Sequence, residues 1–273
     1  MTWEKYSLCF RLLSPLHIGH RKVGNLMQTR GYVPGKVLWA ALTARLTRDS
    51  GQGDQGQRYV DIGRAVNAAF RFEYLYPGLR QSSSEVVTPY YPWADELFAS
   101  RFLSSYASTA LNYNQHSASE GMLHEVEFLR PLAQSFSNND NPHQVYLVGN
   151  MHIKTDLPPD LTSWREALER AQFGGERGYG WGRVALDSVS SNGTTDQTPT
   201  VTVDKSKRAY AHVKVNAGKL SGPIEPVLGW ERNNNQTHNG PSWGISSTVA
   251  CFSPGAVVTE LHTFTIGDFG IWE

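Results

Sequence analysis

One segment, residues 169–184, limits the possible folds of this chain more than any other. Its sequence is ERAQFGGERGYGWGRV, with five glycines among arginines and aromatic residues. Glycine has no Cβ, so such a run lets the backbone adopt positive φ and lets a second stretch of backbone approach closely. The segment therefore predicts either a sharp turn ahead of a strand or a loop built to contact a ligand.

The residue types of this segment favour an anionic polymer as that ligand. Backbone amides in a glycine-rich run can converge on an anion, arginines pair with phosphates, and aromatic rings stack on bases. Neither GK[ST] nor a GxGxxG that opens a helix is present, so a nucleic-acid backbone is favoured over a nucleotide. The residues expected to contact it are Gly174, Gly175, Arg177, Tyr179, Trp181, Gly182 and Arg183.

A second constraint is the stretch from Lys5 to Arg48, which contains no aspartate or glutamate although the whole chain balances 25 basic against 25 acidic residues. A local excess of this kind predicts an electropositive face on a neutral protein. The alternative is an ordinary cluster that acidic residues elsewhere in the fold neutralise. The residues of this stretch expected to bind such an anionic ligand are Gly19, His20, Arg21, Lys22, Arg30 and Lys36.

Apolar periodicity and turn residues predict strands and helices in mixed order up to residue 186, an α+β pattern. We expect strands at 6–13, 71–76, 86–91, 109–113, 122–129, 144–153 and 182–186, with a turn at Pro77-Gly78. We expect helices at 36–47, 59–70, 95–107 and 163–171, the last with a Ser163/Glu166 capping box, and loops at 16–30 and 135–143. Strands 109–113 and 122–129 form a predicted hairpin, whose Asn112 and His116 either reach a ligand or serve as ordinary turn residues.

The remainder of the chain has a different composition. Residues 188–204 are polar and predict a linker between a domain at 1–187 and a mostly β domain at 205–273, with strands at 209–215, 249–252 and 257–265 and a polar loop at 233–239. Cys9 and Cys251 show neither metal-ligand nor disulfide spacing, and the nine histidines are scattered, so we expect no metal and no cofactor. The chain shows no secretory signal and no membrane-length apolar run, which predicts a cytoplasmic protein without membrane contact.

Three blocks of the sequence resemble, in order, a known family. The first joins SPLHIG at 14–19 to YVPGKVL at 32–38 and an apolar helix, the second is EGMLHEVE at 120–127, and the third is the glycine-rich run 174–182. Together they resemble the RAMP superfamily of CRISPR-associated proteins, whose members are RNA-binding subunits built on ferredoxin-like (RRM-like) folds. The resemblance covers about the first two-thirds of the chain, and a second, degraded ferredoxin-like unit after the linker stays open.

This resemblance implies a place in a type III CRISPR effector complex. The implied partners are the guide RNA (crRNA), other RAMP subunits and the large subunit, with target RNA contacted indirectly. In backbone subunits of such complexes an aspartate after the first strand cuts target RNA, but residues 16–35 contain no acidic residue. A non-catalytic subunit that grips the guide RNA, near its 5′ repeat-derived tag or along its length, is therefore favoured.

Two alternatives remain open. The first is a metal-independent endoribonuclease that matures crRNA with His17 and His20, because histidine titrates near neutrality and suits general acid–base catalysis. The corresponding structural alternative is that His17 packs at a strand end and His20 contacts a phosphate. The second is an assembly subunit that binds only protein through exposed aromatic residues, Trp230, Trp243 and Trp272.

Overall fold

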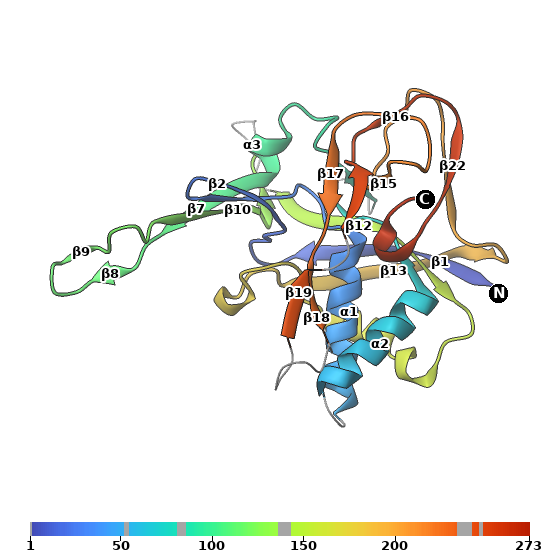
Figure 1. The fold of residues 1–273 in the computed structure, drawn as a ribbon, viewed down its shortest axis with the longest axis horizontal. Coiled ribbons are helices and arrows are strands. Elements are labelled where there is room, and N and C mark those ends of the chain that lie inside the picture. The colour runs from blue at the N-terminus through green and yellow to red at the C-terminus, as the bar shows by residue number, and fades with distance from the viewer. Residues whose placement is uncertain (1, 52–54, 81–85, 136–142, 234–241, 246–247) are drawn as a thin grey trace.

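The computed structural model describes residues 2–51, 55–80, 86–135, 143–233, 242–245 and 248–273 of the chain (Figure 1). Over these residues the fold is mixed α/β and rich in strands, which confirms the expected mixed class. The described α-helices are α1 Gly35–Ser50, α2 Gln55–Ala69, α3 Phe98–Phe102 and α4 Trp164–Glu169. Short 3₁₀ turns occur at Pro159–Leu161 (η1), Arg177–Tyr179 (η2) and Asp268–Gly270 (η3).

The largest sheet has seven strands in the order β13-β1-β12-β5-β6, with β4 and β11 also pairing with β12. Its strands are β1 Trp3–Leu12, β4 Phe70–Phe72, β5 Tyr76–Arg80, β6 Val87–Pro89, β11 Leu132–Ala133, β12 His143–Lys154 and β13 Val184–Thr195. β1 lies between β12 and β13 and runs antiparallel to both of these long neighbours. The predicted strands 6–13 and 144–153 are thus confirmed as two adjacent long strands of this sheet.

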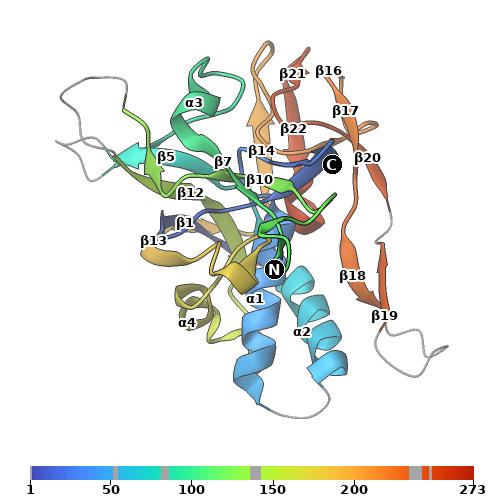
Figure 2. The ribbon, with the colours of Figure 1, turned by 90° about the vertical axis from the view of Figure 1, so that its left-hand side faces the viewer.

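One face of this sheet carries the main hydrophobic core. Leu8, Phe10 and Leu12 alternate along β1 and are at most 2% exposed, and they belong to the same buried cluster as Leu38 and Leu42 of α1. The helices α1 and α2 lie side by side below the sheet (Figure 2). Burial of side chains of this size stabilises a fold by ~1.5–3 kcal/mol each. The alternating apolar residues of β1 and the apolar face of α1 therefore determine which face of the sheet packs against the helices.

Helix α1 begins and ends where the sequence provides suitable residues. Pro34 precedes it in an extended conformation, and Gly51 follows it at φ 61° with its amide bonded to the carbonyl of Arg48. This left-handed cap is the typical use of glycine at a helix C-terminus. The capping box predicted for α4 is not formed, because the Ser163 side chain makes no cap hydrogen bond.

A second sheet, of order β2-β3-β10-β7, lies beside the first. Its strands are β2 Gly19–Val23, β3 Leu26–Thr29, β7 Leu103–Ser108 and β10 His124–Leu129, and the pair β8 Leu111–Asn112 with β9 Ser117–Ala118 continues beyond it. The loop predicted at 16–30 is therefore a β-hairpin. The helix predicted at 95–107 ends at Phe102, and β7 rather than 109–113 is the strand that pairs with β10.

The C-terminal strands are shorter than expected: only Val213–Lys214 of the predicted strand 209–215 is strand, and the predicted strand 257–265 is divided into two. The C-terminal strands are β14 Thr200–Val203, β15 Val213–Lys214, β16 Leu220–Ser221, β17 Ile224–Val227, β18 Trp230–Asn233, β19 Ser242–Ile245, β20 Val249–Phe252, β21 Val257–Val258 and β22 His262–Thr265. The predicted strand 249–252 is confirmed. Most of the predicted loop 233–239 lies outside the described residues.

The C-terminal strands share a core with the first part of the chain. Tyr32, Tyr74 and Tyr76 pack in one buried cluster with Phe264 and Trp272. Trp272 is 0% exposed, so it is not one of the exposed aromatics expected to bind protein. The side chains of the other two expected aromatics, Trp230 and Trp243, lie outside the described part of the chain.

Two further expectations are wrong. Pro77-Gly78 is not a turn but part of β5, where Gly78 is paired with Tyr146 and Pro89. The predicted linker is also strand over most of its length, because β13 runs to Thr195 beside β1 and β14 follows at Thr200–Val203. The division into domains at 1–187 and 205–273 stays a prediction.

Candidate functional site

His17 is the point at which three distant parts of the sequence meet. Its carbonyl oxygen accepts the amide of Gly175 at 2.9 Å, and a Cβ on Gly174 would lie 2.2 Å from the same oxygen. Its ring nitrogen Nδ1 lies 2.7 Å from the carbonyl oxygen of Glu127. The Glu127 carboxylate in turn accepts the amide of Thr29 at 2.9 Å. The first loop, the β10 strand and the glycine-rich segment are thus locked together over more than 100 residues of sequence.

The far end of the glycine-rich segment is held in the same way. The amide of Gly182 donates to the carbonyl of Pro15 at 2.7 Å, and the amide of Arg183 donates to the Ser14 hydroxyl at 2.9 Å. Gly182 has φ 75°, and a Cβ there would lie 1.9 Å from the carbonyl oxygen of Phe173. A side chain does not fit at that distance, so this glycine is required by the backbone path itself.

The amides of the segment are largely used inside the protein. Those of Tyr179 and Gly180 close the turn by donating to the carbonyls of Glu176 and Arg177, each at 3.0 Å, and that of Trp181 donates to Glu176 at 3.4 Å. The expected convergence of amides on an anion is therefore not the role of these groups. What the segment offers a ligand is its side chains.

Those side chains fall into two kinds. Arg177, Tyr179 and Arg183 are exposed, and Tyr179 is 79% exposed. Trp181 instead packs edge-on against Phe128 of β10, with ring centroids 5.0 Å apart. The segment thus presents two guanidinium groups and one phenol ring to solvent, while its tryptophan braces the neighbouring strand.

A cleft of about 1240 Å³ opens between the β2–β3 hairpin, the start of α1, the glycine-rich segment and β17. The predicted site residues that line it are Gly19, His20, Arg21, Arg30, Lys36, Gly174, Gly175 and Arg177. Five other predicted site residues do not line the cleft: Lys22, Tyr179, Trp181, Gly182 and Arg183. Asn112 and His116 are not brought to it either, because they lie at the far end of the β7–β10 hairpin.

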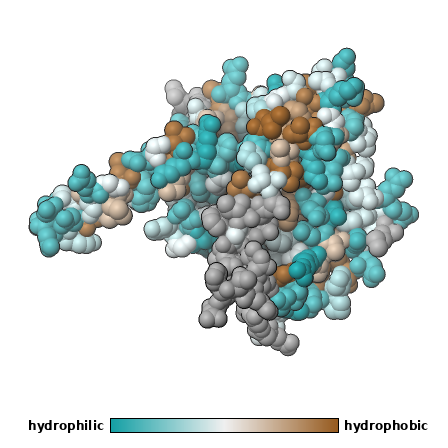
Figure 3. All heavy atoms as spheres, viewed as in Figure 1, coloured by the Kyte–Doolittle hydropathy of each residue, from teal (hydrophilic) through white to brown (hydrophobic). Residues whose placement is uncertain are grey.

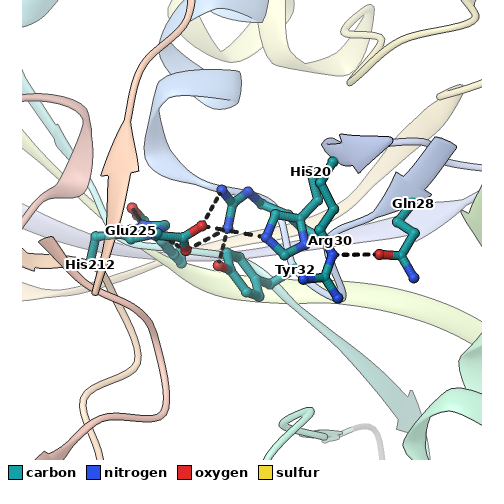
Figure 4. A network of polar contacts seen from close by, with 8 residues as sticks. His20, Gln28, Arg30, Tyr32, His212 and Glu225 are labelled. Atoms are coloured by element: carbon teal, nitrogen blue, oxygen red, sulfur yellow. Dashed lines mark hydrogen bonds and ion pairs between the residues drawn. The ribbon is translucent and has the colours of Figure 1, made fainter. Parts of the chain in front are cut away.

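Inside the cleft, Arg30 is neutralised by a carboxylate from the C-terminal strands (Figure 4). Its two terminal nitrogens donate to the two carboxylate oxygens of Glu225, each at 2.9 Å, and one also donates to the Tyr32 hydroxyl at 2.8 Å. The Arg30 and Glu225 side chains are 14% and 18% exposed. For Arg30 the alternative considered above therefore holds: it pairs with an acidic residue from elsewhere in the fold rather than standing free for a phosphate.

Glu225 is also connected to the buried tyrosines through His212. The His212 nitrogen Nε2 lies 2.7 Å from Glu225, and because a carboxylate only accepts, this nitrogen carries the proton. The neutral ring then accepts the Tyr74 hydroxyl at Nδ1, at 2.6 Å. Burial lowers the pKa of His212, and this effect outweighs the attraction of Glu225. Burial alone would raise the pKa of Glu225, but hydrogen bonds from His212 and Arg30 hold it well below its usual range.

The two histidines proposed as alternative catalytic residues occupy different environments. His17 is 8% exposed, and its Nδ1–H donates to a backbone carbonyl, which is a packing role. The side chain of His20 is 35% exposed in the cleft, with Nε2 3.4 Å from a carboxylate oxygen of Glu225. Burial and the nearby Arg30 lower the pKa of His20, so its ring is neutral near pH 7. Only His20 is therefore placed to meet a ligand.

The remaining cations divide between the rim and the interior of the cleft. The Lys36 ammonium lies over the Phe269 ring, 5.0 Å from its centroid, and Lys214 forms a 2.7 Å ion pair with Glu273. Arg21 and Arg177 are exposed on the side formed by β2 and the glycine-rich segment. The free positive charge of the cleft is thus concentrated along that rim.

The C-terminal contribution to this cleft was missed by sequence reasoning. Glu225, His212 and Lys214 follow no spacing that signals a site, and the available hint was that the acid-free stretch needed an acidic partner. Among the described residues, no group of three His, Cys, Asp or Glu side chains is arranged to hold a metal ion. Within the same residues, no helix is long and apolar enough to cross a bilayer.

Comparison with known proteins gives only remote structural likeness. No family model matches the chain, and no curated protein matches it. One similar solved chain belongs to "Cryo-EM structure of the Type III-B Cmr-beta bound to cognate target RNA and AMPPnP, state 1", at TM-score 0.49 and 13% identity, covering 92% of this chain and 85% of that one. Another belongs to "Cryo-EM structure of the Type III-B Cmr-beta bound to cognate target RNA", at TM-score 0.47 and 14% identity, covering 92% and 86%. Likeness at this level identifies neither a family nor a function for this chain.

Proposed function

We propose that this chain is a non-catalytic, RNA-binding subunit of a type III CRISPR effector complex, with a RAMP-type ferredoxin-like core. In this proposal it grips the guide RNA near the 5′ repeat-derived tag, assembles with other RAMP subunits and the large subunit in the cytoplasm, and meets target RNA only indirectly. It uses no metal and no cofactor, and it makes no membrane contact.

The observation that carries the proposal is the convergence on His17. The three sequence blocks that resemble the RAMP family lie far apart in the chain, yet each supplies a group bonded to, or packed against, this one residue. The block that contains His17 continues directly into Gly19 and His20, which line the cleft. Three blocks that resembled a family by chance would not be expected to lie in contact in the fold. Their contact beside a cationic rim therefore supports a shared function.

The chemistry of the rim suits single-stranded RNA. Arg21 and Arg177 present exposed guanidinium groups on that rim of the cleft, and each can take a phosphate in a charge-assisted contact. Lys22 of β2 and Arg183 of the glycine-rich segment are further exposed cations, and the exposed Tyr179 ring offers a stacking platform for a base. The interior supplies the polar edges of His20 and Glu225, which suit hydrogen bonding to bases.

The test is the salt dependence of RNA binding by the double variant Arg21→Ala/Arg177→Ala. Each phosphate contact on a single strand contributes about −0.7 to the slope of log affinity against log salt concentration, so the variant should lose about 1.4 of that slope. Fluorescence anisotropy with a labelled single-stranded repeat RNA measures it over a range of potassium chloride concentrations. Arg64→Ala is the matched control, because Arg64 is an exposed arginine of α2 that does not line the cleft.

The proposal fails if the double variant and the Arg64 control give the same slope and affinity as the wild type. It also fails if the affinity falls without any change of slope, since the two guanidinium groups would then act through the fold rather than through phosphates. Thermal unfolding of all three proteins checks that the fold is retained.

A second candidate, cleavage of precursor crRNA, is favoured by one observation. The His20 side chain is accessible in the cleft, and burial together with Arg30 lowers its pKa, which favours the neutral imidazole that a general base requires. Incubation of the protein with repeat RNA in EDTA decides between the candidates: cleavage that His20→Ala abolishes would establish this activity. Intact RNA would leave the chain as a binding subunit.

A further inference from the structure

Arg21, an arginine on the rim of the cleft, is held by a neighbour on the opposite strand of its hairpin. Its Nε–H donates to the side-chain oxygen Oε1 of Gln28 at 2.7 Å (Figure 4). A guanidinium group only donates, so the amide atom that faces it is the oxygen. Arg21 and Gln28 are also Cα partners in the register of β2 and β3. The contact is therefore part of the hairpin geometry.

An irregularity in β2 explains why Arg21 faces the cleft. Successive side chains of a regular strand point to opposite faces, yet Gly19, His20 and Arg21 all line the cleft. Gly19 pairs with Thr29 and Arg21 pairs with Gln28, so two steps along β2 match one step along β3. A bulge of this kind changes the direction of a side chain, and here it accounts for two neighbouring side chains on the same side.

The side chain of Arg21 has little other support. Within the described part of the chain, Gln28 supplies its only hydrogen bond. β2 is exposed along its whole length and forms an edge of its sheet. The surface between the projecting β7–β10 hairpin and β17 is mostly hydrophilic (Figure 3). Water therefore competes for both side chains, and without Gln28 the arginine would sample many rotamers.

We propose that Gln28 is a positioning residue for RNA, which fixes Arg21 so that its terminal nitrogens face a phosphate at the rim. The bond occupies Nε–H and leaves the donors on Nη1 and Nη2 free for a bidentate contact with phosphate oxygens. A side chain that is ordered before binding loses less entropy when the ligand arrives. The inference rests on the proposed function, because it needs a phosphate at Arg21.

The test is a double-mutant cycle on RNA binding by the full chain, with Gln28→Met, Arg21→Ala and the two changes combined. Methionine is similar in length to glutamine but lacks a strong acceptor. Gln28→Met should weaken the affinity for a labelled single-stranded repeat RNA about threefold in the wild-type background, and should have no effect in the Arg21→Ala background. It should leave the salt slope unchanged, because the charge of Arg21 remains.

Gln57→Met is the matched control. Gln57 is an exposed glutamine of α2 that donates to Asp61 at 2.9 Å and does not line the cleft. It therefore undergoes the same substitution, with loss of a comparable surface hydrogen bond, and should leave the affinity for RNA unchanged.

A second measurement follows the position of Arg21 without RNA. Nuclear magnetic relaxation of the Nε–H groups in protein with isotope-labelled arginine reports their motion on the picosecond to nanosecond timescale. Gln28→Met should increase the mobility of Arg21 and leave that of Arg64, an exposed arginine of α2, unchanged. Thermal unfolding of every variant shows whether the fold is retained.

Equal losses of affinity in the wild-type and Arg21→Ala backgrounds would overturn the inference, since Gln28 would then act on RNA directly or through the fold. Unchanged affinity in the wild-type background, or unchanged mobility of Arg21 in Gln28→Met, would overturn it as well. Failure of the proposed function looks different: the Arg21→Ala/Arg177→Ala variant would then keep the wild-type affinity and salt slope. That result would overturn the function and this inference together.

Discussion

Three glycines of the 169–184 segment should respond very differently to alanine, although they lie within five residues of one another. Gly178 has no heavy atom within 4 Å of a built Cβ and is not at positive φ, whereas Gly180 has equally open space but φ 82°. Gly182 combines φ 75° with a Cβ position 1.9 Å from the Phe173 carbonyl oxygen. Alanine at Gly178 therefore meets no constraint, alanine at Gly180 meets backbone strain alone, and alanine at Gly182 meets both strain and a steric clash.

The expected costs follow from these differences. Gly178→Ala should change the free energy of unfolding by no more than ~0.5 kcal/mol, because the site accepts a Cβ and the unfolded chain loses some freedom. Gly180→Ala should cost ~1–2 kcal/mol, the price of a left-handed conformation for an L-residue. Gly182→Ala should cost ~3–5 kcal/mol, because relief of the clash also disturbs its bonds to Pro15 and Phe173, each worth about 1 kcal/mol.

Urea unfolding at 25 °C, followed by far-UV circular dichroism and tryptophan fluorescence, measures the three costs on one scale. Equal midpoints for the Gly178 and Gly182 variants would refute the reasoning, since the segment would then be free to move away from the end of β1. A large loss for Gly178→Ala would refute it equally, because open space at that position excludes a steric cost.

Three other changes test separate parts of the structure. Glu225→Gln should cost ~2–4 kcal/mol at pH 7 by leaving Arg30 without an opposite charge. Because the folded-state pKa of Glu225 lies below its unfolded value near 4.3, the wild-type advantage should persist above about pH 4.3 and decline as pH falls further; urea midpoints that differ equally from pH 7 to pH 2 would contradict this. Phe10→Ala should cost ~3–5 kcal/mol, since Phe10 is 0% exposed in the main core, and a loss under 1 kcal/mol in urea unfolding would show that the core closes around the gap. Phe128→Ala should remove the contact with Trp181 and speed amide hydrogen exchange in β7 and β10, and unchanged exchange there would show that the β7–β10 hairpin is anchored elsewhere.

The predictions that succeeded depended on local periodicity. The alternation of Leu8, Phe10 and Leu12 and the stripe that holds Leu38 and Leu42 needed no knowledge of distant partners, because each element buries one face against a common core. The glycine-rich segment was also identified correctly as a place of close backbone approach. The segment alone could not identify its partner, the stretch from Ser14 to His17, because the two are more than 150 residues apart in the sequence.

The failures share a physical cause, which is that neighbours distant in sequence decided the local structure. Residues 188–195 are polar, but as the end of an edge strand they pair with β1 on one side only and bury little, so they need few apolar residues. Tyr106 lies in a stretch with helical composition and is extended because it pairs with Val126. Glu225 meets Arg30 across 195 positions, and nothing around either residue indicates the other.

The core shared by Tyr32, Tyr74 and Tyr76 with the C-terminal strands has a consequence for how this protein can be divided. A fragment that ends at residue 204 would leave this tyrosine cluster uncovered and would leave Arg30 without its carboxylate. A C-terminal fragment would lose the same apolar surface from the other side. The two parts are therefore not interchangeable modules: a replacement C-terminal region would have to bring its own counterparts of Glu225, His212 and Trp272 before the first part could keep its shape.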